Sequence, residues 1–266
     1  MMKKLFAVAL ILMMMVAGFA HAEDTSIQYI LDKGTFILGL DDSFPPMGYR
    51  DENNEIVGFD IDVGKAVAEK LGVEFVAQPI DWAAKELELN AGNIDCIWNG
   101  MSITPERQES MAMTFPYLNN GVAFYVRAED AIATLEDLAG KKVAVQGGSL
   151  AEDLLNGDYA ELAGTFDEVI AFEEYLSALM DLQNGGCDAV LIDVFVAEER
   201  IKGMETASIK CGPVLADDLY GVGFRKADLA LRDKVQEILI EMKADGSLGE
   251  IAKKWFSEDI TIVPAE

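Results

Sequence analysis

Residues 60–80, DIDVGKAVAEKLGVEFVAQPI, hold an amphipathic helix followed directly by a strand. Apolar residues recur at helical spacing up to Leu71, and Gly72 then ends the helix because glycine tolerates the left-handed conformation of a helix cap. From Val73 onward the residues are mainly β-branched, aromatic and apolar, which is typical of a strand. A helix that leads into a strand in this way predicts part of a right-handed, parallel strand-helix-strand unit.

The same alternation extends in both directions from this stretch. Residues 35–40 predict a strand upstream, while residues 83–92 predict a helix and residues 94–100 a strand downstream. A second series begins near Leu135 with a short helix. Its later strands and helices alternate in the order KKVAVQGG, LAEDLLNG, EVIAF, EEYLSALMDLQNG and CDAVLID. Two such series predict two α/β lobes with mostly parallel sheets and helices on both faces.

Two extended segments connect these series, at 122–130 and 219–225. If both cross between lobes, the chain leaves the first lobe near Val126 and returns near Gly221. We therefore expect lobe 1 to hold residues 23–126 and 220–266, and lobe 2 to hold residues 127–219. The two crossover strands would form the hinge.

The amino terminus predicts the compartment. Lys3 and Lys4 precede an apolar run, which ends in a small-x-small cleavage site at Ala20-His-Ala22. This pattern is typical of a secretory signal peptide over residues 1–22. No cysteine follows the run, so lipid attachment is not indicated. The mature chain is expected to be soluble and periplasmic.

Charge and composition exclude several classes of function. The net charge is −26, and removal of the signal takes away two lysines, so nucleic acid and anionic membranes are not expected partners. His21 lies in the signal, which leaves the mature chain without histidine for a catalytic triad or a typical zinc site. We expect no metal and no cofactor. Cys96 is predicted to be a buried thiol, and a bridge between Cys187 and Cys211 is left open.

Residues 99–107, NGMSITPER, predict the end of a strand and the start of a helix, with Thr104 as the N-cap and Pro105 in the first turn. Arg107 then opposes the partial positive charge of the helix N-terminus. It is either a solvated arginine offset by nearby glutamates or one that faces a bound anion. In open α/β sheets, ligands bind outside the carboxyl ends of the strands, and we expect a cleft there between the lobes.

The order and spacing of several motifs resemble the bacterial extracellular solute-binding proteins of family 3, which serve ABC transporters for polar amino acids. The motifs are DDSFPPMGY, NNEIVGFDIDVGKAVAEKLG, GNIDCIWNGMSITPER, FPYL, LAGKKVAVQGGS, CDAVLID and GVGFRK with the tail DGSLGEIAKKWF. The resemblance covers essentially the whole mature chain. It implies a two-lobed, type II periplasmic-binding-protein fold.

Residues that match the family's motifs are expected to hold the α-carboxylate of the ligand. Arg107 matches the bidentate arginine, whose planar fork of donors fits a carboxylate. Ser102 would add its N–H and hydroxyl, and the carbonyl of Gly100 would accept from the α-ammonium. In lobe 2 the resemblance implies that backbone N–H groups of Ser149 and Leu150 face the same carboxylate.

Other matching residues are expected around the ammonium and the side chain of the ligand. The resemblance implies that Asp193 from lobe 2 and Asp41 from lobe 1 hold the α-ammonium, although either could instead cap the turn after its strand. Phe44 and Trp82 match two aromatic walls or, alternatively, fill the core. The remaining candidates for the polar end of the pocket are Asn99, Gln146 and Asp60, of which Asp60 could equally cap the helix after it.

The resulting prediction is a non-enzymatic, monomeric protein that binds a free L-amino acid and delivers it to the membrane permease of an ABC transporter by hinge closure. A polar or cationic amino acid, or cystine, is expected. The alternative is an exported enzyme on the same scaffold, similar to cyclohexadienyl or arogenate dehydratases. Without histidine, such an enzyme would need a carboxylic acid of raised pKa, such as Asp193 or Glu173. A sensing module of a membrane receptor is a second rival.

Overall fold

The computed structural model describes residues 24–202 and 209–265, and the predicted signal peptide lies outside them. Its main sheet has the strand order β10-β9-β11-β8-β12-β6-β1-β5, with β7 paired to β12. The bounds of these strands are β1 (Thr35–Leu40), β5 (Glu74–Pro79), β6 (Cys96–Ser102), β7 (Met111–Met113), β8 (Leu118–Arg127), β9 (Lys142–Gln146), β10 (Glu168–Phe172), β11 (Ala189–Asp193) and β12 (Ile209–Arg225).

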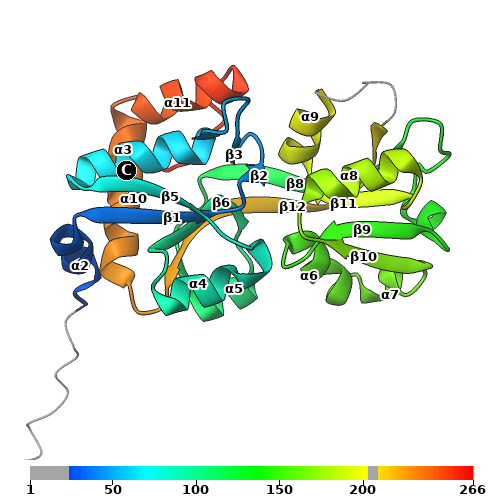
Figure 1. The fold of residues 1–266 in the computed structure, drawn as a ribbon, viewed down its shortest axis with the longest axis horizontal. Coiled ribbons are helices and arrows are strands. Elements are labelled where there is room, and N and C mark those ends of the chain that lie inside the picture. Colours follow the sequence, from blue (N-terminus) through cyan, green and yellow to red (C-terminus); the bar gives the residue numbers. More distant parts are fainter. Residues whose placement is uncertain (1–23, 203–208, 266) are drawn as a thin grey trace, which may run out of the picture.

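Helices cover both faces of this sheet in two groups (Figure 1). Lobe 1 carries β1, β5, β6 and β7, and its helices are α2 (Ser26–Lys33), α3 (Phe59–Leu71), α4 (Lys85–Ala91), α5 (Pro105–Ser110), α10 (Leu229–Ala244) and α11 (Ser247–Phe256), with the 3₁₀ turn η1 (Trp82–Ala84). Lobe 2 carries β9, β10 and β11, and its helices are α6 (Leu150–Asn156), α7 (Ala160–Ala163), α8 (Tyr175–Asn184) and α9 (Val194–Lys202), with η2 (Leu135–Leu138). The predicted α/β class is confirmed.

Within each lobe the strands that alternate with helices are parallel. β1 pairs with β5 and β6, and β9 pairs with β10 and β11. Parallel sheets are buried on both faces, and alternate residues of one strand enter different cores. Val190 and Ile192 of β11 join a core cluster that extends into both lobes, whereas Ala189 and Leu191 join a cluster on the other face of lobe 2. Both faces of β11 are therefore buried.

β8 and β12 are the two strands that connect the lobes. They pair antiparallel with each other from Leu118↔Tyr220 to Arg127↔Ile209. On its other edge β8 pairs with β11 of lobe 2, and the last residues of β12 pair with β6 and β7 of lobe 1. Residues 122–126 of β8 pair with β11 of lobe 2. The position predicted for leaving lobe 1, near Val126, therefore lies at the end of β8 that is already beside lobe 2. Bulges interrupt β12 near Val214 and Gly221.

A second, small sheet was not expected from the sequence. It consists of β2 (Ser43–Phe44), β3 (Gly48–Arg50) and β4 (Ile56–Val57), in that order. Strands of two or three residues carry too few positions for a period of two to be recognised. This sheet follows β1 directly and carries Phe44 to the lobe boundary, where it packs against Tyr175 of lobe 2.

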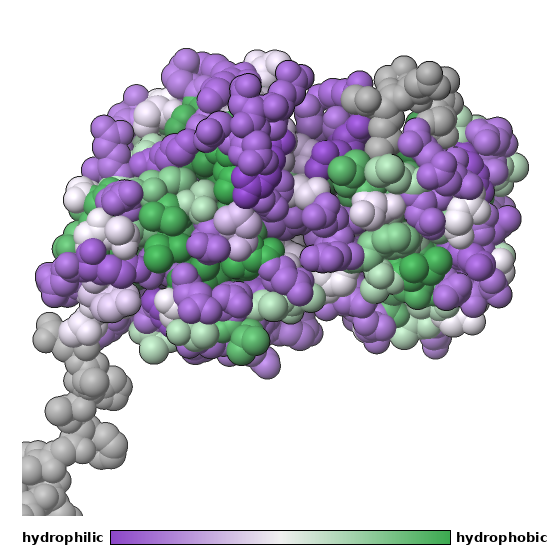
Figure 2. Space-filling model, viewed as in Figure 1, coloured by the Kyte–Doolittle hydropathy of each residue, from purple (hydrophilic) through white to green (hydrophobic). Residues whose placement is uncertain are grey.

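The surface and the cysteines complete the description. Hydrophilic residues cover most of the face in Figure 2, including the boundary between the two lobes. Cys96 is buried as predicted, and Cys187 and Cys211 are both free thiols. Among the described residues there is no helix long and apolar enough to cross a membrane.

Candidate ligand-binding cleft

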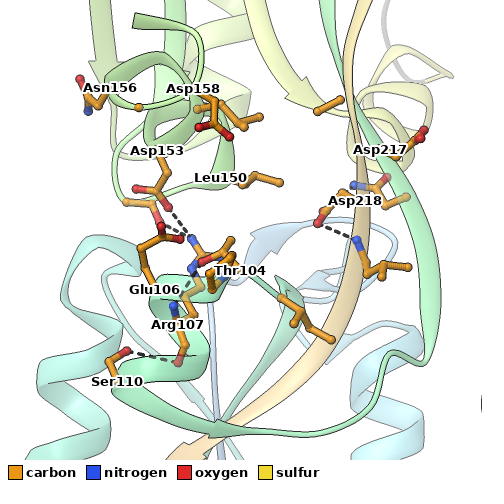
Figure 3. Close-up of a pocket in the computed structure, with 18 of the residues that line it drawn as sticks. Thr104, Glu106, Arg107, Ser110, Leu150, Asp153, Asn156, Asp158, Asp217 and Asp218 are labelled. Carbon is orange, nitrogen blue, oxygen red and sulfur yellow. Dashed lines mark hydrogen bonds and ion pairs between the residues drawn. The ribbon is translucent and has the colours of Figure 1, made fainter.

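A cavity of about 1200 Å³ opens between the lobes, and both crossing strands contribute to its wall. Arg107 and Leu150 are the predicted site residues that line it, beside Lys85, Gly148, Asn120 and Asp218. Figure 3 shows Arg107 and Glu106 on the lobe 1 side, Leu150 and Asp153 on the lobe 2 side, and Asp218 on the opposite wall. The cavity is therefore built by parts of the chain that are distant in sequence.

Arg107 is held in the wall by the local structure that the sequence predicts. The hydroxyl of Thr104 accepts from the Arg107 backbone N–H at 3.2 Å, and Pro105 opens helix α5. The side chain is only 5% exposed. Its Nη1 donates to the Ser102 carbonyl at 3.1 Å, and its Nη2 reaches lobe 2, where it donates to the Gly148 carbonyl at 3.2 Å and to Asp153 at 3.1 Å. The interpretation of Arg107 as a freely solvated arginine is wrong.

Two buried carboxyl groups lie close to Arg107. Asp193, at the end of β11, accepts from the Tyr220 hydroxyl at 2.7 Å and from the Asn120 amide at 2.8 Å. The same amide donates to Asp218 at 3.3 Å, and Asp218 also accepts from the Ser102 hydroxyl at 3.0 Å. Ser102 thus contacts the guanidinium through its carbonyl and a carboxylate through its hydroxyl.

The carboxyls of Asp193 and Asp218 hold their protons more tightly than an exposed aspartate does. Burial raises the pKa of Asp193 to about 7, and the charge of Asp218 adds to the rise, while the bond from Tyr220 opposes it. Burial raises the pKa of Asp218 as well. A cation placed beside the pair would relieve this cost, because an opposite charge favours the ionised form.

Asp41, Asn99 and Gln146 meet at the other end of the interface between the lobes. Gln146 donates from lobe 2 to Asp41 at 2.7 Å and to the Glu173 carbonyl at 3.0 Å. The Asn99 side chain accepts from the Asp41 backbone N–H at 3.1 Å. Burial raises the pKa of Asp41 to about 6, against the opposing effect of the Gln146 bond. All three side chains are buried, so this end of the interface is closed by direct polar contacts.

The two predicted aromatic walls lie at the lobe boundary. Phe44 packs against Tyr175 of lobe 2, with ring centroids 6.1 Å apart. Trp82 opens η1, and the ammonium of Lys85 lies over its ring at 5.1 Å from the centroid. Gly100 lies beside Phe44 in the left-handed region, at φ 59°, and a Cβ there would come within 2.8 Å of the Phe44 ring. Glycine is required at this position because a larger residue would displace the aromatic wall.

Asp60 lies beneath the cleft. Its side chain is 0% exposed, and one of its oxygens accepts from the Gly100 N–H at 2.8 Å and from the Tyr117 hydroxyl at 2.9 Å. Burial raises its pKa to about 7. In this structure Asp60 supports the Gly100 backbone and is enclosed by protein. The expectation that it reaches the polar tail of a ligand is not supported by this placement.

Ser149 and Leu150 begin helix α6, as predicted. Ser149 is the N-cap, and its hydroxyl accepts from the Glu152 N–H at 3.3 Å and donates to the Gln146 carbonyl at 2.7 Å. Leu150 lines the cavity. Its place at the start of the helix brings the Gly147-Gly148 turn against Trp82 and Arg107 of lobe 1.

Sequence reasoning missed several residues that the fold brings to the cleft. They are Lys85, Asn120, Tyr175, Arg200 and Asp218. Arg200 of α9 crosses the lobe boundary to bond the carbonyl and the hydroxyl of Ser43 at 2.9 and 2.8 Å. One sequence signal could have pointed to Asn120 and Asp218. Each belongs to a polar doublet, Asn119-Asn120 or Asp217-Asp218, at the edge of a segment that connects the lobes.

Nothing in residues 24–202 and 209–265 gathers three or more His, Cys, Asp or Glu side chains into a group that could hold a metal ion. The buried polar groups of the cleft are hydroxyls, amides, carboxyls and two cations. Such a set suits a small zwitterion, whose two opposite charges need partners of opposite sign.

Comparison with known proteins decides the family. Residues 36–258 match the bacterial extracellular solute-binding proteins, family 3. The chain belongs to this family. It is 29% identical over 257 residues to the L-cystine-binding protein TcyJ of Escherichia coli K12, an alignment that covers 96% of this chain and 94% of that protein. This family membership identifies a solute-binding protein rather than an enzyme.

Solved structures agree with this family and with the fold. The substrate-binding protein of an ABC uptake transporter from Streptococcus pneumoniae, with bound histidine, superposes with a TM-score of 0.86 at 33% identity and covers 91% of this chain and 99% of that one. The structure of Tv2483 bound to L-arginine gives a TM-score of 0.85 at 30% identity and covers 91% and 98%. The predicted two-lobed, type II periplasmic-binding-protein fold is confirmed.

Proposed function

We propose that this family member binds a free L-α-amino acid between its lobes and delivers it to the permease of an ABC transporter. The observation that carries the proposal is the position of Ser102. Its carbonyl contacts the Arg107 guanidinium at 3.1 Å, and its hydroxyl contacts Asp218 at 3.0 Å. A cation and a buried carboxylate thus lie on either side of one residue, as a ligand with a carboxylate and an ammonium on the same carbon requires.

The remaining head-group contacts follow from the same arrangement. Arg107 would hold the α-carboxylate, with the N–H groups of Ser149 and Leu150 as further donors. The hydroxyl of Ser102 donates to Asp218 in this structure and would turn to the carboxylate when the ligand binds. Asp193 would pair with the α-ammonium, and the Gly100 carbonyl would accept from it. The raised pKa of Asp193 supports this role, since an ammonium would restore the ionised form.

Asp41 was expected to hold the α-ammonium, but it lies with Asn99 and Gln146 at the other end of the interface, so it would face the side chain of the ligand instead. That side chain would extend between the rings of Phe44 and Trp82. Polar walls favour a polar tail, and aromatic faces favour a flat or cationic one. We propose a polar or cationic amino acid, or cystine, as the ligand. Three similar proteins support this class. One is named an L-cystine-binding protein, and two are solved structures with bound histidine and with bound L-arginine.

The same proposal includes location and motion. Export by residues 1–22 would place a monomer in the periplasm, and bending of β8 and β12 would open and close the cleft. We keep the lobe boundaries at 126/127 and 219/220 as part of this proposal, together with recognition of the closed form by the permease.

A melting screen tests the proposed ligand class. Protein refolded from denaturant, to remove carried-over amino acid, is heated with each of the twenty L-amino acids, cystine and ornithine. A ligand at about 100 times its dissociation constant adds roughly 2.7 kcal/mol to the free energy of unfolding, which is on the order of 5–10 °C in Tm here. The largest increase is expected from arginine, lysine, glutamine, histidine or cystine, and little from aspartate or glutamate.

Two outcomes would contradict the proposal. One is a screen in which sugars or peptides give the largest increase in Tm. The other is an increase that survives α-N-acetylation of the best amino acid, because acetylation removes the ammonium that Asp193 is proposed to bind. Binding without transport would leave the ligand assignment intact and refute only the delivery step.

A further inference from the structure

Lys85 is the lysine that the described part of the chain buries most deeply, with 5% of its surface exposed. It is the first residue of α4, and Leu87, two residues later in the same helix, is exposed. A lysine on a short amphipathic helix normally extends into water. Here the side chain instead turns inward, over the Trp82 ring and toward lobe 2.

The partners of the Lys85 ammonium are carbonyl oxygens. Its Nζ donates to the Gly148 carbonyl of lobe 2 at 2.8 Å and to the Trp82 carbonyl at 3.2 Å. None of the ion pairs within residues 24–202 and 209–265 involves this ammonium. A carbonyl dipole compensates a buried charge less than a carboxylate does. The most deeply buried lysine thus lacks the partner that would best offset its charge.

Arg107 reaches the same oxygen. Its Nη2 donates to the Gly148 carbonyl at 3.2 Å, so the two cationic nitrogens share one acceptor and lie within about 6 Å of each other. Burial and the neighbouring guanidinium lower the pKa of Lys85 to about 8, which keeps the ammonium charged at neutral pH. Both side chains line the cavity. Two cations at this spacing can each contact one oxygen of the same carboxylate.

Gly148 makes the arrangement possible. Its φ is +71°, and a Cβ there would come within 3.0 Å of Ala83 and 3.2 Å of the Lys85 Nζ. The absence of a side chain lets the start of α6 approach both cations of lobe 1. Lobe 2 therefore closes over the two cations at the place where the proposed head group lies.

We propose that Lys85 is a second cationic contact for the ligand's α-carboxylate, beside Arg107, and that it makes the site select a free carboxylate over an uncharged amide. This inference rests on the proposed amino-acid ligand and deepens it. The rival role for Lys85 is an interlobe latch that bonds Gly148 whatever the ligand. The two roles differ in one measurable quantity, the ratio of affinities for an acid and its amide.

The test compares L-arginine with L-argininamide and L-histidine with L-histidinamide, by calorimetry on the wild type and on Lys85→Met. We expect the wild type to prefer each acid by at least about a hundredfold, and Lys85→Met to reduce that preference by at least about tenfold. Lys85→Arg, which keeps the charge, should retain most of the preference. Lys65→Met, which removes an exposed lysine of α3, serves as the control and should leave the ratio unchanged.

The outcome that overturns the proposal is an acid-to-amide ratio in Lys85→Met equal to that of the wild type, with both affinities weakened alike. That result assigns Lys85 to the latch. Circular dichroism of each variant confirms that it is folded.

Failure of both amino acids to bind would count against the proposed function. A second measurement then tests the Lys85 contact by itself. Sodium malonate, compared with sodium chloride at equal ionic strength, should raise the Tm of the wild type and of Lys65→Met by more than that of Lys85→Met, which keeps only the general stabilising effect of the salt. An equal response of the wild type and Lys85→Met to malonate would refute the carboxylate contact independently of the amino acid.

Discussion

The two ends of the interface between the lobes are built differently. At one end Arg107 and Asp218 line a cavity, Asp193 lies behind its wall bonded to Asn120, and opposite charges are separated by a single residue, Ser102. At the other end Asp41 and Gln146 bond directly across the boundary at 2.7 Å. The first end carries the charges that every free amino acid shares. The second end carries a carboxyl and two amides, which can distinguish one amino-acid side chain from another. Recognition of the head group and selection of the side chain thus occupy separate places.

Replacing Arg107 by lysine is expected to give the largest effect. Lysine keeps the charge but loses the planar fork, and lost hydrogen bonds to charged groups cost roughly 1.5–3 kcal/mol each. Affinity for any amino acid should fall about a hundredfold in calorimetry, by a similar factor whatever the side chain. Arg50→Lys, at an exposed arginine of β3, is the matched control. Unchanged affinity in Arg107→Lys would remove the guanidinium from the site.

Asp193→Asn should weaken binding roughly tenfold to a hundredfold, because an amide offers no charge to the ammonium. In the ligand-free protein, by contrast, the substitution should raise the free energy of unfolding near neutral pH relative to the wild type. Burial and Asp218 raise the pKa of Asp193 to about 7, so the folded state binds more protons than the unfolded state between about pH 4 and 7. The contribution of this group to the free energy of unfolding is therefore lost as the pH rises through that window.

Urea denaturation at several pH values measures this contribution. The wild type should lose more stability than Asp193→Asn between about pH 4 and 7, and the control Asp217→Asn, at an exposed neighbour of Asp218, should follow the wild type. Parallel curves for the wild type and Asp193→Asn would indicate that the carboxyl is ionised in the folded protein. A large loss of stability in Asp193→Asn would instead make it a structural residue.

Gln146→Leu sharpens the comparison from the other end. It removes the bond to Asp41 but leaves Arg107, Ser102 and Asp193 in place. Affinity for L-arginine relative to L-norleucine, which has the same head group and an apolar tail, should fall about threefold to tenfold. If both ligands change by the same factor, Gln146 closes the lobes and does not read the side chain.

Trp82→Phe is expected to have the smallest effect on affinity, within about threefold, since phenylalanine keeps an aromatic wall. The change in tryptophan emission on ligand binding should nevertheless be mostly lost. Trp98 packs against Tyr117, and Trp255 packs against Tyr49 and bonds Asp62 of α3, so these contacts of both tryptophans lie within lobe 1. Emission that responds as in the wild type would assign the signal to one of these two residues and place Trp82 in the core.

The local pattern of the sequence was enough for the elements that alternate. The strands β1, β5 and β6 and the helix α3 follow from periodicity, and Thr104 and Pro105 predict the start of α5 because capping is a local interaction. The same pattern placed Arg107 at the helix start but left a solvated arginine open, and only the family resemblance assigned it to a carboxylate. Its position in a cleft wall, bonded across to Gly148, depends on the second lobe and could not be obtained from the spacing alone.

The residues that were missed are those whose partners are far away in the chain. Asp218 matters because Ser102 and Asn120, at separations of 116 and 98 residues, bond it. Lys85 reads as a surface lysine until lobe 2 closes over it. Asp60 was expected to contact the tail of the ligand, yet its carboxylate holds the Gly100 amide, which no local pattern distinguishes from a helix cap.

The paired strands β8 and β12 give the hinge a particular signature in hydrogen exchange. Backbone bonds join them through the crossing, and the bulge in β12 near Val214 interrupts this ladder only locally and lets the strand bend. Opening of the lobes would thus leave the amide protons of both strands slow to exchange. The amide of Gly148, which bonds Glu152 within lobe 2, lies at the boundary and would report the motion instead.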